Sequence, residues 1–223
     1  LPPQGRAPPD PRVLLQGFGS VGGAAALDRA RAGFRIVGSA DVRGCLLHED
    51  GFAVDDIEGF LQRREGNTLP SVTGTGTSGP GETFFDTPGD LLVAAAASGT
   101  LNRDVLSRIQ AAGVHSIVAG ANHPFAAEAP GDTSVEQDAD SRFAVVADII
   151  ASCGTAHAFA CQSRSDFPLQ PHTVFASIES TVAEAVDEAV RRAEGANRGL
   201  LAAALAMALE RCDGITPTTH PTE

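Results

Sequence analysis

Apolar and polar positions follow two patterns that alternate along the chain. Five short apolar runs have the length of buried parallel strands and lie at 12–16, 34–41, 90–97, 116–119 and 143–148. Apolar residues recur at helical spacing over 20–32, near 54–64, over 101–112, around 149–161, and over 173–194 and 198–211. The alternation predicts an α/β fold, a Rossmann-like, doubly wound, mainly parallel sheet with closing C-terminal helices.

The remaining segments carry no such pattern. The stretch 43–80 is polar, and apart from one short helix we expect it to be irregular. TGTGTSGPGE at 73–82 has low complexity and predicts a flexible loop. Residues 1–11 are rich in proline and predict a linker or disordered start, and residues 213–223 predict a frayed tail. One domain therefore covers residues 12–212.

A glycine-rich turn joins the first strand to the first helix. The residues from Gly17 to Gly22, GFGSVG, match the pattern GxGxxG, with a predicted strand before it and a predicted helix after it. Gly17 permits the tight turn, Gly19 lets a pyrophosphate approach the backbone, and Gly22 lets helix and strand pack closely. The first turn of the helix adds N–H groups and a partial positive charge. This turn predicts a dinucleotide-binding site.

An acidic residue ends the second strand. Asp41 lies 19 positions after Gly22, close to the spacing of about 20 in dinucleotide-binding folds. A carboxylate there accepts hydrogen bonds from both ribose hydroxyls and repels a 2′-phosphate, which favours NAD. Arg43 is a candidate partner for such a phosphate, so NADP is not excluded. The alternative interpretation is a turn without a ligand, with Asp41 capping a loop.

Composition limits the classes of function. With 16 basic and 28 acidic residues, the net charge of −12 opposes a nucleic-acid-binding surface. No apolar run approaches the roughly 18 residues of a membrane span. Four separated cysteines and six scattered histidines show no metal-ligand spacing, so we predict no metal site and reduced thiols in a cytoplasmic protein. All 16 basic residues are arginines, which excludes any mechanism that needs a lysine from these 223 residues.

Six blocks of the sequence resemble, in their order along the chain, the cofactor domain of the glutamate/leucine/phenylalanine/valine dehydrogenases. They are VLLQGFGSVGGAAA, RIVGSADVRG, HEDGFAVDDIEGFL, DLLVAAAASGTLNRDVLSRI, IVAGANHPFAAEA and FAVVADIIASCGTAHAF. The resemblance implies an NAD(P)-binding domain over 12–212, from a two-domain enzyme that interconverts an L-amino acid and its 2-oxo acid with ammonia. It also implies that Asn122 lies beside the nicotinamide ribose, and that the run 92–97 passes under the adenosine ribose and the nicotinamide.

The chain departs from the family pattern at several positions. Ala94 stands where the family usually has proline, and Ser152 replaces an asparagine whose amide helps to orient the nicotinamide. The family's substrate domain lies upstream and carries a catalytic lysine and an aspartate, whereas here about a dozen residues precede the first strand. We therefore expect the substrate domain on an upstream segment or another chain. The proline-rich start and the absence of an initial Met favour this hypothesis.

Three hypotheses of function follow. The first is an NAD(P)-binding oxidoreductase domain of the amino-acid dehydrogenase type, not self-sufficient in catalysis and part of a homo-oligomer. The alternative is a non-catalytic dinucleotide-binding accessory or scaffold module. A third is an enzyme that uses His123 or His157 as acid or base, the latter with Cys153 four positions earlier on the same helical face, although a packed cysteine and a satisfied histidine are the default.

No catalytic residue is assigned from the sequence. The predicted cofactor-binding residues are Gly17, Phe18, Gly19, Ser20, Val21, Gly22, Asp41, Val42, Arg43, Ala95, Ala96, Asn122 and Ser152.

Overall fold

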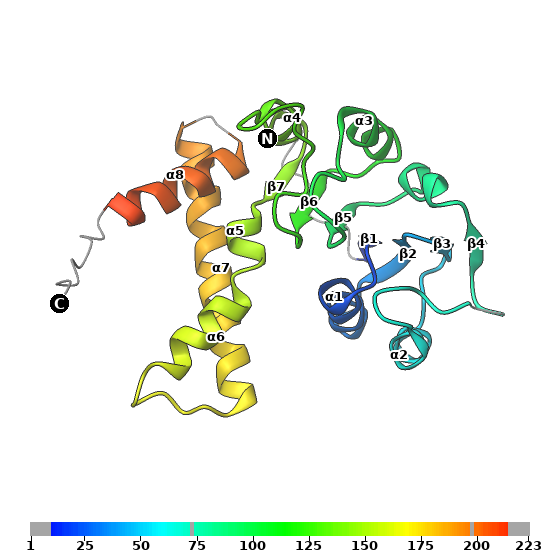
Figure 1. Ribbon diagram of the computed structural model, residues 1–223, viewed down its shortest axis with the longest axis horizontal. Helices are drawn as coiled ribbons and strands as arrows, with labels where there is room; N and C mark the ends of the chain where they lie inside the picture. Colours follow the sequence, from blue (N-terminus) through cyan, green and yellow to red (C-terminus); the bar gives the residue numbers. More distant parts are fainter. Residues whose placement is uncertain (1–9, 72–73, 197–198, 214–223) are drawn as a thin grey trace.

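A seven-stranded sheet forms the centre of the molecule (Figure 1). The computed structural model describes residues 10–71, 74–196 and 199–213, and the strand order is β4-β3-β2-β1-β5-β6-β7. The five parallel strands are β1 (Arg12–Gln16), β2 (Arg35–Asp41), β5 (Leu91–Ala94), β6 (Ser116–Ala119) and β7 (Ala144–Val146). Because β1 pairs with both β2 and β5, the strand order reverses between β1 and β5, which is where doubly wound folds bind ligands. The predicted fold class is confirmed.

Helices cover both faces of the sheet, as Figure 1 shows. On one face Val13 and Leu15 of β1 pack into a buried cluster with α1 (Ser20–Arg31) and α2 (Val54–Arg63). On the other face Leu14 packs into a second cluster with α3 (Arg103–Ala111) and α4 (Ser134–Arg142). Successive side chains of a strand point to opposite faces, so one apolar run of β1 serves both clusters. The sequence did not predict α4, because only Val135 and Ala139 in it are buried.

The prediction that 43–80 is irregular outside its helix was wrong. β3 (Gly44–Leu47) folds back on β2 as an antiparallel hairpin, and β4 (Thr77–Gly79) pairs with β3. The loop predicted at 73–82 therefore contains a strand and the start of a 3₁₀ helix, η1 (Gly81–Asp86), while Thr73 lies outside the described residues. The exposed edge of an existing sheet supplies the hydrogen bonds that fix these short segments, and no local periodicity signals such pairing.

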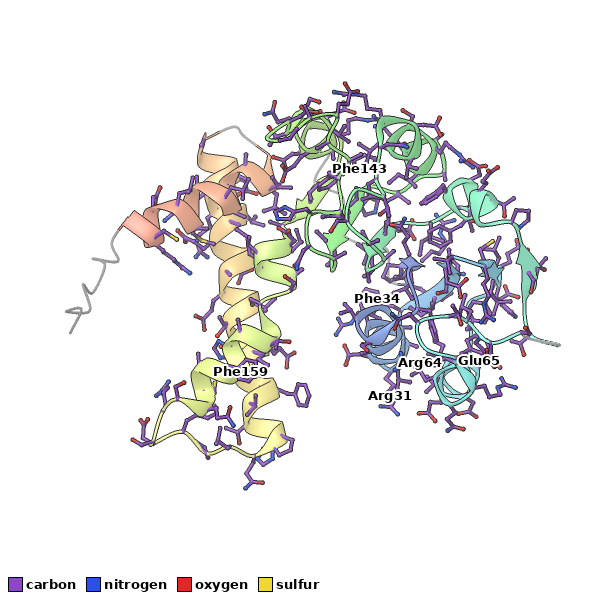
Figure 2. All side chains as sticks on the ribbon, viewed as in Figure 1. Arg31, Phe34, Arg64, Glu65, Phe143 and Phe159 are labelled. Atoms are coloured by element: carbon purple, nitrogen blue, oxygen red, sulfur yellow. The ribbon has the colours of Figure 1, made fainter. Side chains whose placement is uncertain are left out.

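The C-terminal helices α5 (Asp148–Ala151), α6 (Gly154–Gln162), α7 (Pro171–Ala196) and α8 (Leu200–Asp213) extend beyond the sheet. The helical stretch expected around 149–161 is divided into α5 and α6 by a turn at Ser152 and Cys153. Figure 2 contrasts Phe143, buried between α4 and β7, with Phe159 on α6, whose side chain is exposed. The predicted linker lies mostly, and the predicted tail almost entirely, outside the described residues, although Asp213 itself ends α8. Among the described helices none is long and apolar enough to cross a membrane.

The helix α8 is anchored by a carboxylate from α4. Asp140 accepts hydrogen bonds from the backbone N–H groups of Leu201 at 2.8 Å and Ala202 at 2.9 Å. These are two of the N–H groups that a helix leaves without an internal acceptor at its start. Asp140 therefore serves as an N-terminal cap supplied from a distant helix, and it holds the C-terminal helices against the edge of the sheet at β7.

Candidate functional site

A cavity of about 720 Å³ opens where the strand order reverses. Its walls come from the turn after β1, the end of β2, the loop after β5, and the neighbouring η1 and α3. Of the predicted cofactor-binding residues, those that line it are Gly17, Phe18, Gly19, Asp41, Val42, Ala95 and Ala96. The structure therefore brings together three segments that are far apart in the sequence, at the carboxyl ends of parallel strands.

The glycine turn is shaped by close backbone contacts. Gly17 has a φ of 97°, and a Cβ there would lie 2.6 Å from the carbonyl oxygen of Ala95. A Cβ on Gly22 would lie 1.9 Å from the carbonyl oxygen of Gly17, so only glycine lets α1 start this close to β1. Gly19 faces the side chain of Asn67, which the sequence analysis did not identify.

The other residues of the turn contribute in different ways. The side chain of Phe18 is 1% exposed and packs edge-on against Phe60, so this residue can offer only its backbone to the cavity. Ser20 and Val21 lie in the first turn of α1 and are exposed. Side chains of these two residues do not line the cavity, but backbone N–H groups in a first helical turn have no acceptor within the helix. The turn presents polar backbone rather than polar side chains.

Asp41 lies at the boundary between two cavities. One carboxylate oxygen accepts from the backbone N–H of Arg43 at 2.7 Å, and the other accepts from the backbone N–H of Leu69. Arg43 donates from its guanidinium to the hydroxyl of Thr68 at 2.6 Å and to the carbonyl of Leu69. It thereby lines a smaller cavity of about 170 Å³, which Asp41 also borders, and it does not line the larger one. Each carboxylate oxygen keeps acceptor capacity beyond its backbone bond.

Part of the cavity wall is formed by residues for which the sequence offered no signal. Phe85 of η1 and Arg108 of α3 both line the cavity, with the guanidinium 5.8 Å from the ring centre. Arg108 also donates to both carboxylate oxygens of Asp86, at 2.9 and 2.8 Å. This hydrogen bonding lowers the pKa of Asp86 and raises the pKa of Arg108. The contacts join η1 to α3, and because the sequence pattern predicted no element over 83–86, no sequence signal identified them.

Asn122, in the turn after β6, and Ser152, at the end of α5, come together, although they are not among the residues that line the large cavity. The hydroxyl of Ser152 lies 3.4 Å from Oδ1 of Asn122 and donates to the carbonyl of Asp148 at 2.7 Å. Ser98 donates to the carbonyl of Asn122 at 2.6 Å, which ties the loop after β5 to the turn after β6. The loop after β5 also lines the cavity through Ala95 and Ala96. Asn122 and Ser152 therefore lie along the same edge of the sheet as the cavity.

A histidine and two carboxylates lie beside this pair. The backbone N–H of His123 donates to Oδ2 of Asp148 at 2.9 Å, and its imidazole Nδ1 lies 3.9 Å from the same oxygen. His123 has a φ of 48°, unusual for a residue with a side chain, and its imidazole is 91% exposed. Burial, and next the charge of Asp148, raise the pKa of Glu136, while the charge of His123 opposes them.

The alternative of a Cys153–His157 pair has no hydrogen bond to support it within the described residues, and the default of a hydrogen-bonded histidine fits the structure. The imidazole of His157 pairs with the hydroxyl of Ser177 on α7 at 2.8 Å, and Cys153 is a free thiol at the start of α6. All four cysteines are free. Within the described residues, no group of three or more His, Cys, Asp or Glu side chains could hold a metal ion.

A doubly wound sheet with a glycine-rich turn at its switch point defines a Rossmann-type α/β domain. The glutamate/leucine/phenylalanine/valine dehydrogenase family matches residues 5–216, and the chain belongs to this family.

Two curated relatives are glutamate dehydrogenases. The chain is 29% identical over 143 residues to the NADP-specific glutamate dehydrogenase of Saccharolobus shibatae, with 64% of this chain and 31% of the relative covered. It is 32% identical over 143 residues to the glutamate dehydrogenase of Thermotoga maritima, with 64% and 32% covered. The chain therefore spans about a third of the length of these relatives.

The chain also matches solved structures of amino-acid dehydrogenases. The hetero-hexameric glutamate dehydrogenase of Thermus thermophilus, in its Leu-bound form, matches with a TM-score of 0.72 at 27% identity and covers 96% of this chain and 48% of that one. The L-tryptophan dehydrogenase of Nostoc punctiforme matches with a TM-score of 0.66 at 14% identity, covering 95% and 55%, which shows a shared fold. The chain spans about half of each structure.

Proposed function

We propose that the chain is the NAD(P)-binding domain of an amino-acid dehydrogenase, an enzyme that oxidatively deaminates an L-amino acid to its 2-oxo acid. The observation that carries the proposal is the cavity at the switch point, which has the glycine turn on one side and Asp41 on the other. Its volume of about 720 Å³ lies in the range of cofactor sites. Membership of the dehydrogenase family supports the same conclusion.

The residues present fit a dinucleotide. The backbone at Gly19 and the first turn of α1 would hold the pyrophosphate, and Asp41 would accept from the adenosine ribose. Val42 and Phe85 offer an apolar wall for the adenine. The remaining half would follow Ala95 and Ala96 toward Asn122 and Ser152. When bound, the nicotinamide supplies the hydride acceptor or donor, and the role of this chain is to bind and orient it.

NAD is the cofactor that we propose. Asp41 borders the cavity where a 2′-phosphate would sit, and like charges there repel. Arg43 is held by Thr68 and Leu69 on the side of the smaller cavity, so its charge is directed away from the larger one. NAD⁺ should therefore bind at least about tenfold more tightly than NADP⁺. Tighter binding of NADP⁺ in parallel titrations would overturn this choice of cofactor.

Catalysis requires groups that these 223 residues do not contain. The family's chemistry uses a lysine in the substrate domain, and this sequence has no lysine. We therefore propose that a substrate domain, on an upstream segment or another chain, closes over the nicotinamide in a homo-oligomer. Mixing the chain with NAD⁺ and L-glutamate, L-leucine, L-phenylalanine or L-valine should give no turnover. Turnover by this chain alone would contradict the requirement for a second domain.

Titration with NADH, followed by nicotinamide fluorescence, tests the binding itself. We expect a saturable signal at concentrations below about 1 mM. The Asp41→Ala variant should bind NADH about tenfold more weakly, because it loses the ribose hydrogen bonds. Asp28→Ala is the matched control, because Asp28 is an exposed carboxylate of α1 that does not line the cavity. The absence of any saturable signal, or equal losses in both variants, would overturn the proposal.

A non-catalytic dinucleotide-binding module is the second candidate. It is favoured by Ser152, whose hydroxyl is already engaged by Asp148 and Asn122 where the family has an amide. This module would bind the dinucleotide equally well. The natural reading frame upstream of Leu1 separates the two candidates, since a lysine-bearing segment there supports the enzyme and a start codon within a few residues supports the module.

A further inference from the structure

A short segment after α2 is tied to the two charged side chains at the end of β2. Residues 65–69, which we call the clasp, begin just beyond the end of α2, where Figure 2 labels Glu65. The carbonyl of Glu65 accepts from the backbone N–H of Thr68 at 3.2 Å and from the hydroxyl of Thr68 at 2.7 Å. These two bonds close a tight turn, which fixes the orientation of the Thr68 side chain.

The clasp holds the guanidinium of Arg43. Arg43 donates from Nη2 to the hydroxyl of Thr68 at 2.6 Å and to the carbonyl of Leu69. The hydroxyl of Thr68 has one proton, which it donates to Glu65, so it meets Arg43 with a lone pair. Hydrogen bonds from a charged donor are stronger than those between neutral groups. The guanidinium is therefore restrained at the smaller cavity, which Arg43 lines.

The clasp also holds the carboxylate of Asp41. The backbone N–H of Leu69 donates to one carboxylate oxygen, and the backbone N–H of Arg43 donates to the other at 2.7 Å. Asp41 borders both cavities, whereas Arg43 lines only the smaller one. The same loop thus fixes a negative charge at the large cavity and keeps the positive charge of Arg43 away from it.

These contacts bear on the choice between NAD and NADP. In dinucleotide-binding folds a carboxylate at the end of the second strand excludes the 2′-phosphate, whereas a nearby arginine accommodates it. This chain has both groups, two positions apart. We propose that Thr68 is a positioning residue for cofactor specificity, whose hydroxyl holds Arg43 away from the 2′ position and makes the site prefer NAD. The inference rests on the proposed function, because it concerns the adenosine end of that same site.

The other arginine at the large cavity is independent of the clasp. Arg108 donates to both carboxylate oxygens of Asp86, at 2.9 and 2.8 Å, and to the carbonyl of Glu82 at 2.6 Å. All three acceptors belong to η1, and within the described part of the chain Arg108 makes no hydrogen bond to residues 65–69. A variant of Thr68 therefore changes the restraint on Arg43 and leaves that on Arg108 as it is.

The size of the effect follows from a linked equilibrium. Arg43 can reach a 2′-phosphate only after it leaves Thr68 and Leu69, so the apparent affinity for NADP⁺ is reduced by the fraction of molecules in which Arg43 is free. NAD⁺ has no group that needs Arg43, and its affinity carries no such penalty. A hydrogen bond to a charged group corresponds to about tenfold or more in such an equilibrium. Loss of the Thr68 acceptor should therefore favour NADP⁺ by about tenfold.

The test is the ratio of the dissociation constants of NADP⁺ and NAD⁺, measured by calorimetry on this chain. Thr68→Val, which keeps the shape of the side chain without its hydroxyl, should lower this ratio about tenfold, chiefly through tighter binding of NADP⁺. Thr68→Ser keeps the hydroxyl and should retain the ratio of the wild type. In the background of Arg43→Gln, Thr68→Val should no longer change the ratio, because the charge that it releases is absent.

Ser107→Ala is the matched control. The hydroxyl of Ser107 on α3 likewise donates to a backbone carbonyl, that of Arg103 at 2.9 Å, and accepts from a guanidinium, that of Arg142 at 3.4 Å. Ser107 lines neither cavity, so its loss should leave the ratio unchanged.

The outcomes separate this inference from the proposed function. An equal ratio in the wild type and Thr68→Val, or a change that persists in the background of Arg43→Gln, overturns the inference while dinucleotide binding itself stands. A wild type that prefers NADP⁺ also overturns it. If neither dinucleotide binds, the proposed function fails instead. Thr68→Ala supplies a second variant without the hydroxyl, so the test does not depend on the folding of Thr68→Val.

Discussion

Two neighbouring glycines of α1 provide the sharpest test of how the turn is built. In a helix, replacing glycine with alanine normally stabilises the folded state by about 1 kcal/mol. At Gly22 the new Cβ would lie 1.9 Å from the carbonyl oxygen of Gly17, where ordinary contact begins at 3.4 Å, so α1 would have to withdraw by about 1.5 Å. Overpacking of this kind typically costs about 1–3 kcal/mol and more when backbone must move. Gly22→Ala should therefore lower the free energy of unfolding by about 2 kcal/mol net.

Gly23 is the matched control, because it lies in the same turn and the one contact of its Cβ shorter than 3.4 Å would be with the terminal methyl of Leu61, at 2.6 Å. That side chain can rotate away, so Gly23→Ala should stay within about 1 kcal/mol of the wild type. Urea denaturation followed by circular dichroism measures the stability of both variants. In thermal unfolding, the midpoint of Gly22→Ala should lie about 4–8 °C below that of the wild type. If both variants were equally stable and bound NADH alike, the close contact between α1 and β1 would not shape the site.

Three further predictions concern other parts of the fold. Asp140→Ala should lower the free energy of unfolding by about 1–2 kcal/mol and speed amide exchange in α8, because it removes the cap of that helix; unchanged exchange would contradict this role. Hydrogen bonds from Arg12 lower the pKa of Asp90, so the ionised carboxylate stabilises the fold above its unfolded value near about 4 and this contribution is lost as the pH falls through the lowered folded value. Acid titration of Asp90→Asn should lack that loss and show about 1–2 kcal/mol less stability at neutral pH. His123→Gly should raise the free energy of unfolding, measured by urea denaturation, by up to about 1 kcal/mol, because glycine adopts the positive φ without strain. A loss of stability would show that the imidazole makes a stabilising contact.

The dinucleotide-binding half of the fold was largely predictable from the sequence. The runs at 12–16 and 116–119 match β1 and β6 residue for residue, because buried parallel strands are short, apolar and bounded by breakers. The spacing from the glycine turn to Asp41 placed both at one edge of the sheet, and the structure puts both at one cavity. That these residues bind a dinucleotide stays a prediction.

Other parts of the site depended on contacts between distant segments. Phe85 and Arg108 form a wall only because η1, whose sequence GETFFD has no apolar periodicity, packs against α3. The side chain of Phe18 points into the core rather than the cavity because Phe60 of α2 lies beneath it. Neither orientation follows from local sequence, since each depends on a partner more than 20 residues away.

Local sequence is enough to predict the main alternation of strands and helices and the position of the glycine turn, and it shows that these residues include no lysine. The groups that face each other became evident from the folded chain: Asp41 with the backbone of Leu69, Asp140 with the start of α8, and His123 with Asp148. The difference lies in the range of the interactions. Backbone conformation and strand burial depend on neighbours along the chain, whereas the field and shape of a site come from side chains that the sheet brings together from several strand ends.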